Sequence, residues 1–186
     1  MTAARHAMAI AGAAPPAAAT SAPGPRGEPD PLALRKVLGR FATGVTIVTC
    51  IDADGQRVGL TANSFNALSL EPPLVLWSLR QASPCLPAFA AARHFAVNVL
   101  AASQIELSHR FASPIADRFA HGDWHDGAGG VPVLAGAAAV FECERTLHQA
   151  AGDHILFIGR VLHAAGSAAA PLLFHAGHYH LLGDRL

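Results

Sequence analysis

Small polar side chains interrupt the apolar segment LTANSF, residues 60–65, at Thr61, Asn63 and Ser64. Such side chains leave neighbouring backbone N–H and C=O groups open to a planar ligand, and they add hydrogen bonds to ring carbonyls and nitrogens. The same residues are also common at the end of a strand that binds nothing. Composition alone leaves both interpretations open, so this segment is a candidate binding edge.

A second candidate is the loop between Ser78 and Ser83, which leads into an expected helix over 82–93. Backbone N–H donors and the helix dipole make a helix N-terminus a good place for a phosphate group. An ordinary N-cap explains Ser83 equally well.

The third candidate is the segment AGDH, residues 151–154, which immediately precedes the apolar run ILFIGRV. Gly152 permits a tight turn, and Asp153 either stays solvated or holds that turn. His154 would then lie at the mouth of a strand, where an imidazole could contact a ligand. A histidine that merely occupies a turn is the commoner outcome of this spacing.

Several common chemistries lack their motifs in this sequence. It contains no G-x-G-x-x-G or G-x-x-x-x-G-K-[ST] nucleotide loop, no G-x-S-x-G elbow and no H-E-x-x-H helix. Eleven histidines include the close set His175, His178 and His180, but no carboxylate or thiolate partner stands at ligand spacing. We therefore expect no metal site.

The composition describes one domain with a large core. The 186 residues are 52% hydrophobic and 14% charged, with a formal net charge of zero, which argues against nucleic-acid or anionic-membrane binding. No run of about 18 strongly apolar residues exists to span a bilayer. The three cysteines are odd in number and unclustered, which favours a reducing, cytoplasmic location over a disulfide framework.

The pattern along the chain predicts a short tail followed by a mainly β domain. Residues 1–30 contain eleven Ala and five Pro, typical of a disordered linker, so we place the domain at 31–186. Asp30-Pro31 indicates the start of a helix whose apolar face comprises Leu34, Val37, Leu38 and Phe41.

Strands are expected at 45–51, 58–65, 73–79 and 94–100, then in AAAVFECERTLHQA, HILFIGRVLHAAG and LLFHAGHYHLL. A capping box at Ser103–Glu106 predicts a helix to about Phe111. Many strands with few short helices favour an antiparallel barrel.

These segments together resemble the flavin reductase family, small FMN-binding split barrels that reduce free flavin for two-component monooxygenases. The resemblance runs from about residue 32 to 181 in the segments RKVLGRFATGVTIVT, GLTANSFNALSLEPPLVLWSL, FAVNVL, RFA, DRF, GGVPVLAGAAAVFEC, AGDHILFIGRV and PLLFHAGHYH. It implies a Greek-key split barrel that forms a homodimer and binds FMN or FAD non-covalently. It also implies that NADH or NADPH docks transiently and that a monooxygenase receives the reduced flavin.

The resemblance assigns residue roles by position. Expected cofactor-binding residues are Thr61, Ala62, Asn63, Ser64, Phe65, Ala67, Leu68, Ser78, Ala82, Ser83, Pro84 and Phe111. Expected nicotinamide-side residues are His154, His178 and Tyr179, with His154 as the catalytic residue that positions the nicotinamide. No essential acid or base is expected, because the flavin carries the redox chemistry.

The sequence departs from the family pattern at two places. The phosphate loop RQASPCLPA has Pro84 and few cations, so a basic partner must come from Arg80 or Arg110. Residue 178 is His where the family usually has Arg or Lys, and no clamp for a 2′-phosphate is evident, which leans towards NADH.

Two other functions remain open at this point. One is a non-catalytic split barrel that binds flavin or haem; the presence of both the TANSF and AGDH segments argues against it. The other is a relative of pyridoxamine-phosphate oxidase, which should carry more basic residues for its substrate phosphate. A dimer also follows from the composition, since a small apolar barrel leaves surface to bury.

Overall fold

The computed structural model describes residue 27 and residues 29–184. The tail predicted for residues 1–30 therefore lies almost wholly outside the described residues. The strands are β1 (Thr43–Gly44), β2 (Thr46–Ile51), β3 (Arg57–Ala62), β4 (Asn66–Leu70), β5 (Pro73–Arg80), β6 (His94–Val99), β7 (Trp124–Asp126), β8 (Pro132–Leu134), β9 (Ala139–Ala151), β10 (His154–Gly166), β11 (Leu173–His175) and β12 (His178–His180). The helices are α1 (Pro31–Leu38), α2 (Leu86–Ala91), η1 (Ala102–Gln104), α3 (Ile105–Ala112), η2 (Arg118–Ala120) and η3 (Ala128–Gly130).

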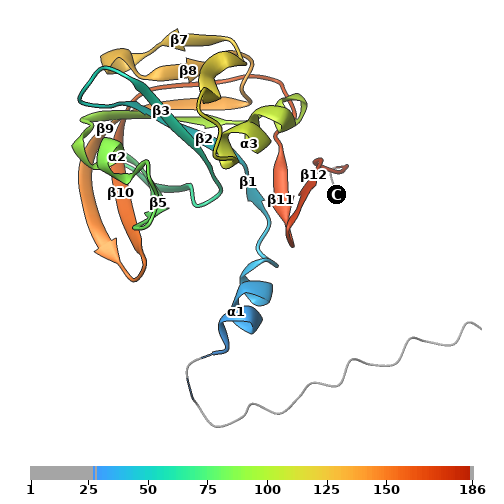
Figure 1. Ribbon diagram of the computed structural model, residues 1–186. Helices are drawn as coiled ribbons and strands as arrows, with labels where there is room; N and C mark the ends of the chain where they lie inside the picture. The colour runs from blue at the N-terminus through green and yellow to red at the C-terminus, as the bar shows by residue number, and fades with distance from the viewer. Residues whose placement is uncertain (1–26, 28, 185–186) are drawn as a thin grey trace, which may run out of the picture.

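One antiparallel sheet of seven strands forms the body of the molecule, in the order β3-β2-β6-β9-β10-β5-β4 (Figure 1). Strands β3 and β4 are its two ends, and in the described part of the chain no ladder joins them. Two smaller sheets, β1-β11-β12 and β7-β8, accompany it. The predicted antiparallel, mainly β architecture is confirmed.

Alternation along β5 separates the core from the opposite face of the strand. Val75, Trp77 and Leu79 are buried, whereas the side chains between them are partly exposed, as a period of two requires. The Trp77 ring is fully buried and stacks on Phe157 with ring centroids 4.7 Å apart. Truncating such a buried aromatic side chain costs about 3–5 kcal/mol, so this pair is central to the stability of the sheet. Ser78 lies on the other face.

The β9–β10 hairpin is the longest ladder of the sheet. Gly159 lies at one of its two register shifts, and a Cβ there would stand 2.4 Å from Cζ of Phe95 and 2.9 Å from Cβ of Cys143. A glycine is required because β10 crosses these side chains so closely.

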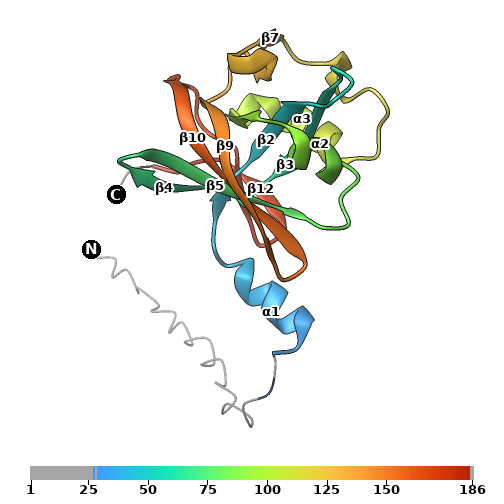
Figure 2. The same ribbon diagram turned by 90° about the vertical axis from the view of Figure 1, so that its left-hand side faces the viewer.

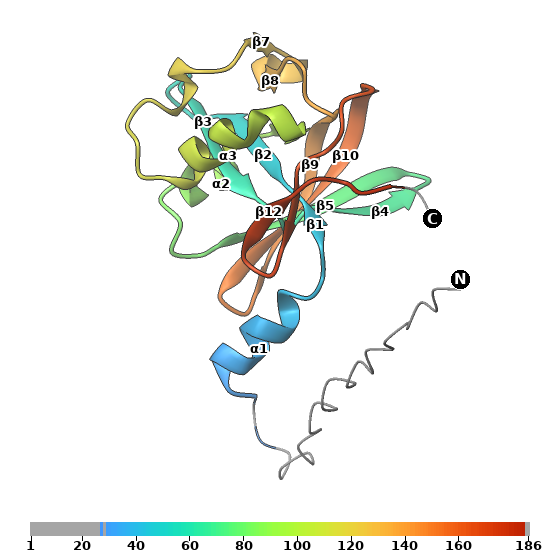
Figure 3. The same ribbon diagram turned by 90° about the vertical axis from the view of Figure 1, so that its right-hand side faces the viewer.

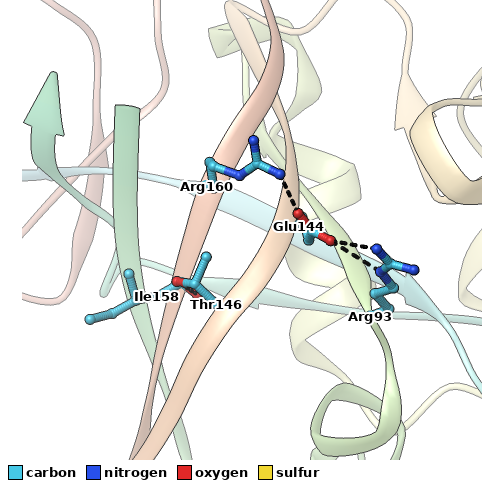
Figure 4. A network of polar contacts seen from close by, with 5 residues as sticks. All are labelled: Arg93, Glu144, Thr146, Ile158 and Arg160. Carbon is cyan, nitrogen blue, oxygen red and sulfur yellow. Dashed lines mark hydrogen bonds and ion pairs between the residues drawn. The ribbon is translucent and has the colours of Figure 1, made fainter. Parts of the chain in front are cut away.

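On the surface of the same hairpin, Glu144 accepts hydrogen bonds from two arginines, as Figure 4 shows. Arg93 Nη2 lies 2.8 Å from Oε1, and the Arg160 guanidinium contacts Oε2. These hydrogen bonds lower the pKa of Glu144 to about 2. The network ties the start of β6 to β9 and β10.

Three sequence predictions about local structure need correction. The helix expected over 82–93 is confined to α2, because Pro87 in its first turn sets where the helix begins. The predicted capping box at Ser103 is replaced by Gln104, whose Oε1 accepts from the Ala101 N–H at 3.0 Å. The strand expected over 58–65 ends at Ala62, and residues 63–65 connect β3 to β4 outside the ladder.

Helix α1 projects from the body of the molecule, and none of its residues is buried (Figure 3). Its predicted N-cap is confirmed, since Asp30 Oδ2 accepts from the Ala33 N–H at 2.9 Å. Of the predicted apolar face, Leu34, Val37 and Leu38 lie on the helix, whereas Phe41 lies beyond its end. Val37, Leu38 and Phe41 are uncovered, being 68%, 64% and 74% exposed.

No helix among the described residues is both long enough and apolar enough to cross a bilayer.

Candidate active site

A groove of about 490 Å³ lies between the end of β3, the end of β5 and the β9–β10 turn. We call it the inner groove. Its lining residues are Leu60, Thr61, Ala62, Asn63, Ser64, Ser78, Leu79, Arg80, Ala82, Ser83 and His154. Eight of the residues predicted to bind the cofactor or the nicotinamide therefore meet in one place, although they come from three distant segments. They are Thr61, Ala62, Asn63, Ser64, Ser78, Ala82, Ser83 and His154.

The β3 wall of the inner groove exists because β3 ends the sheet. It pairs with β2 on one side only, and the ladder stops at Ala62. The connection that follows is fixed by Ser64, whose Oγ donates to the Ser78 carbonyl at 2.8 Å and accepts from the Ser78 N–H at 3.0 Å. Thr61 Oγ1 donates to the Ser108 carbonyl at 2.7 Å, which attaches the strand to α3. The wall thus combines held hydroxyls with backbone groups that the ladder does not use.

His154 is the first residue of β10 and is held in place at the β9–β10 turn. Its Nδ1 lies 2.7 Å from Asp153 Oδ1, and this contact lowers the pKa of the Asp153 carboxyl. Gln81 fixes the turn twice: its N–H donates to the Asp153 carbonyl and its Nε2 to the Gly152 carbonyl, both at 2.9 Å. The carboxylate therefore orients the imidazole and leaves Nε2 for a ligand in the groove.

Arg80 is the cation that lines the inner groove. The sequence left the basic partner open between Arg80 and Arg110. Arg110 is engaged elsewhere, because its guanidinium donates to the carbonyls of Asp117 and Arg118. An anionic group beside Ser83 would therefore meet Arg80.

Three predicted cofactor residues lie on β4 or just before it and do not line the inner groove. Phe65 packs on the core with its ring 5.4 Å from that of Phe141. Ala67 and Leu68 are exposed on β4. Pro84 lines a separate hollow beside the groove, described below.

Phe111, which the resemblance assigns to the flavin side, is buried and does not line the inner groove. Its side chain is 1% exposed and packs edge-on against Phe119, with ring centroids 5.0 Å apart. It belongs to a second core cluster, together with Val45 and Leu134.

The two predicted nicotinamide residues on β12 do not line the inner groove either. His178 is exposed, and Tyr179 is half-buried with its Oη 2.8 Å from Ser108 Oγ. Tyr179 is linked to the groove only indirectly, since the Ser108 carbonyl accepts from Thr61.

One contributor to the site is hard to find in the sequence. Gln81 reaches the turn that carries Asp153 and His154 only because β10 pairs with β5, with His154 opposite Arg80. The two segments are more than 70 residues apart, and no local motif specifies that pairing. Among the described residues, no group of three or more His, Cys, Asp or Glu side chains gathers as a metal site would require.

The sequence model of a protein family, the flavin reductase like domain, matches residues 38–183 of this chain. This chain belongs to the flavin reductase like family. Its solved structural neighbours share the arrangement of strands, and the predicted split-barrel fold is confirmed.

Three relatives illustrate the family. The chain is 46% identical over 145 residues to the FMN reductase (NADH) SmoA of Agrobacterium fabrum, covering 78% of this chain and 82% of the relative. It is 44% identical over 151 residues to the flavin-dependent monooxygenase reductase subunit HsaB of Rhodococcus jostii. That match covers 81% of this chain and 77% of the relative. The structure of the Streptomyces globisporus NADH:FAD oxidoreductase SgcE6, solved with NAD and FAD fragments, superposes with a TM-score of 0.78 at 38% identity. The superposition covers 83% of this chain and 93% of SgcE6. The chain spans about half the length of some other curated relatives, 48% and 47% in two cases.

In this flavin reductase family member, the size of the inner groove and the residues that line it fit a flavin. The volume of the groove lies within the roughly 300–1,000 Å³ of small-molecule pockets. Backbone groups at 61–64 and the Asn63 amide match the carbonyls and nitrogens of the ring edge. The Thr61 and Ser64 hydroxyls donate to protein carbonyls and hold this wall in place. Ser83 and Arg80 provide a hydroxyl and a cation for a phosphate.

Proposed function

We propose that this protein is an NAD(P)H:flavin oxidoreductase that transfers hydride from NADH to FAD or FMN and supplies reduced flavin to a partner monooxygenase. The observation that carries the proposal is the inner groove itself. Segments 60–64, 78–83 and residue 154 converge on it, and they combine a ring-edge wall, a phosphate cradle and an oriented imidazole. The names of the relatives support both the reductase activity and the monooxygenase partner.

Each part of the groove has its own role. When bound, the flavin supplies the redox chemistry by accepting hydride from the nicotinamide. Ala62, Asn63 and Ser64 hold the polar edge of the ring and stabilise negative charge there. Arg80 and Ser83 hold the phosphate. His154, oriented by Asp153, positions the nicotinamide against the ring, and proximity rather than acid–base chemistry provides the rate.

NADH is the proposed reductant over NADPH. In the described chain, Arg80 is the one arginine or lysine that lines the inner groove, and the phosphate of the flavin already requires it. A 2′-phosphate on the reductant would need a further basic partner. His178, where the family usually has a permanently charged residue, does not line this groove.

A steady-state assay tests the function directly. Purified protein is given NADH or NADPH in combination with FAD, FMN or riboflavin, and oxidation of the nicotinamide is followed. We expect rapid turnover with NADH and a flavin, and less with NADPH. Tight flavin binding with no nicotinamide oxidation would instead support the alternative of a non-catalytic flavin-binding barrel.

We also propose that the protein works as a cytoplasmic homodimer. The uncovered side chains of Leu34, Val37 and Leu38 on α1, and of Phe41 just beyond it, offer apolar surface to a second copy. All three cysteines are free and buried, which suits a reducing compartment. Light scattering should give the dimer mass for the natural chain and the monomer mass for Val37→Asp.

A further inference from the structure

A second hollow, of about 850 Å³, lies beside the inner groove and has no role in the function proposed above. We call it the outer hollow. It is formed by the β2–β3 turn, by α2 with the residues just before it, and by residues 115–119. Figure 2 shows α2 beside β3 at this end of the sheet. The outer hollow is larger than the inner groove and lies within the size range of ligand pockets.

The two hollows adjoin along two chain segments. On β3, Val58 and Gly59 line the outer hollow and the next residues line the inner groove. In the loop after β5, Ala82 and Ser83 line the inner groove, and the next two residues, Pro84 and Cys85, line the outer hollow. A ligand whose phosphate lies at Ser83 therefore has the outer hollow directly ahead of it.

The outer hollow is lined by apolar side chains and by charged side chains of both signs. Proline, alanine and phenylalanine side chains form the apolar part, among them Pro87, Ala91 and Phe119, and these suit the flat face of an aromatic base. Asp52 and Asp54 in the β2–β3 turn also line it, and Arg57 and Arg118 are the cations of its lining. Carboxylates accept hydrogen bonds from an exocyclic amine or from ribose hydroxyls, and they repel a terminal phosphate.

A cation is held at the junction between the two hollows. Arg118 Nη1 donates to the Gly59 carbonyl at 2.8 Å and contacts Cys85 Sγ at 3.4 Å. Its Nε and Nη2 both donate to the Ser113 carbonyl, at 3.2 and 3.0 Å. The guanidinium is thereby fixed on the path from the phosphate loop into the outer hollow, where a diphosphate bridge would pass.

We propose that the outer hollow binds the adenosine end of FAD, so that this protein selects FAD over FMN. FMN ends at the phosphate and leaves the outer hollow without a ligand, whereas FAD continues through a diphosphate into an adenosine. The proposal rests on one part of the proposed function, namely that the flavin ring binds in the inner groove.

Equilibrium binding of FAD and FMN to the natural chain and to Ala91→Trp tests the proposal. Ala91 is exposed on α2 and lines the outer hollow, so tryptophan would fill the hollow without entering the core. We expect FAD to bind about tenfold more tightly than FMN to the natural chain, a difference near 1.4 kcal/mol. In Ala91→Trp the two affinities should become equal through the loss of FAD affinity alone. Unchanged FMN binding shows that the variant is folded and that its inner groove is intact.

Alkylation of Cys85 provides a readout that does not depend on activity. Cys50 and Cys143 are fully buried, and burial raises the pKa of each thiol to about 12, so neither should react. Cys85 is 9% exposed and lines the outer hollow. Treatment with iodoacetamide, followed by mass spectrometry, should label Cys85 in the free protein. FAD should slow this labelling severalfold more than FMN at equal saturation.

Two results would overturn the proposal. One is equal affinity for FAD and FMN in the natural chain. The other is an unchanged preference for FAD in Ala91→Trp together with a raised KM for NADH when FMN is the acceptor, which would assign the hollow to the adenosine of the reductant. A protein that prefers FAD yet oxidises no NADH would refute the proposed function and leave this inference standing.

Discussion

The β9–β10 hairpin has a middle, around Glu144 and Gly159, and a tip, at residues 151–154. Both parts belong to the same two strands, but the polar groups and the packing around them differ. In the middle, Glu144 has two arginine partners, and Gly159 lies against the Phe95 ring with no room for another atom. At the tip, Gly152 has open space around it and His154 faces the inner groove. The contrast indicates that the middle holds the sheet together and the tip serves the ligand. Substitutions should therefore separate into those that change stability and those that change turnover.

The largest effect is expected in the middle, from Gly159→Ala. The new methyl group would meet Cζ of Phe95 at 2.4 Å and Cβ of Cys143 at 2.9 Å. Because the core is close-packed, this overpacking should lower the free energy of unfolding by about 1–3 kcal/mol. Chemical denaturation measures the loss directly.

Gly166→Ala on the same strand is the matched control. The nearest atom to its added Cβ is the Ala138 carbonyl oxygen, at 3.9 Å. Its unfolding free energy should stay within about 1 kcal/mol of the natural chain. Equal losses in the two variants would mean that the close approach at Gly159 has no energetic weight.

The next largest effect is expected at the tip, from His154→Ala. Loss of the imidazole should lower kcat/KM for NADH about tenfold, mainly through a higher KM, because His154 positions the nicotinamide. The unfolding midpoint should hardly move, since the side chain is partly exposed. His163→Ala, exposed on the same strand, should leave both quantities unchanged. Unaltered turnover and KM in His154→Ala would refute the positioning role.

The sequence predicts the middle of the hairpin better than its tip. The alternation of apolar residues specifies the strands, and the AGDH segment correctly indicates that a strand begins at His154. The contacts that make the tip a site come from pairing across the sheet: Gln81 donates to the turn at Gly152 and Asp153. Periodicity specifies which face a residue takes but not which distant strand lies opposite, so those contacts needed the structure. Phe111 shows the same limit, because the RFA match that assigns it to the flavin side does not reveal that its side chain is buried.

A smaller effect at the tip is expected from Asp153→Asn, which keeps the size of the side chain and removes its charge. Without the carboxylate the imidazole is held less firmly, so kcat/KM should fall about two- to threefold. In the natural chain the pKa of Asp153 is lowered by His154, so the carboxylate is charged throughout the neutral range. The advantage of the natural chain should therefore persist from neutral pH down to mildly acidic pH and disappear only as pH falls through that lowered pKa. A pH profile of kcat/KM for both proteins makes the comparison, and a difference confined to alkaline pH would contradict the role.

The smallest effect is expected from Glu144→Gln in the middle, because both arginine partners are substantially exposed and water competes for them. The pKa of Glu144 is lowered from its ordinary 4.5 to about 2 in the folded protein. A carboxyl whose pKa falls on folding stabilises the folded state above its unfolded pKa, and this contribution is lost as pH drops towards the folded value. Glu144→Gln should therefore melt slightly below the natural chain at pH 6, and the two melting temperatures should converge between pH 4.5 and 2. Turnover at pH 7 should be unchanged, because neither Glu144 nor its two arginine partners line the inner groove. A loss of turnover without a loss of stability would break the division between the two parts of the hairpin, since it would give the middle a role in ligand binding.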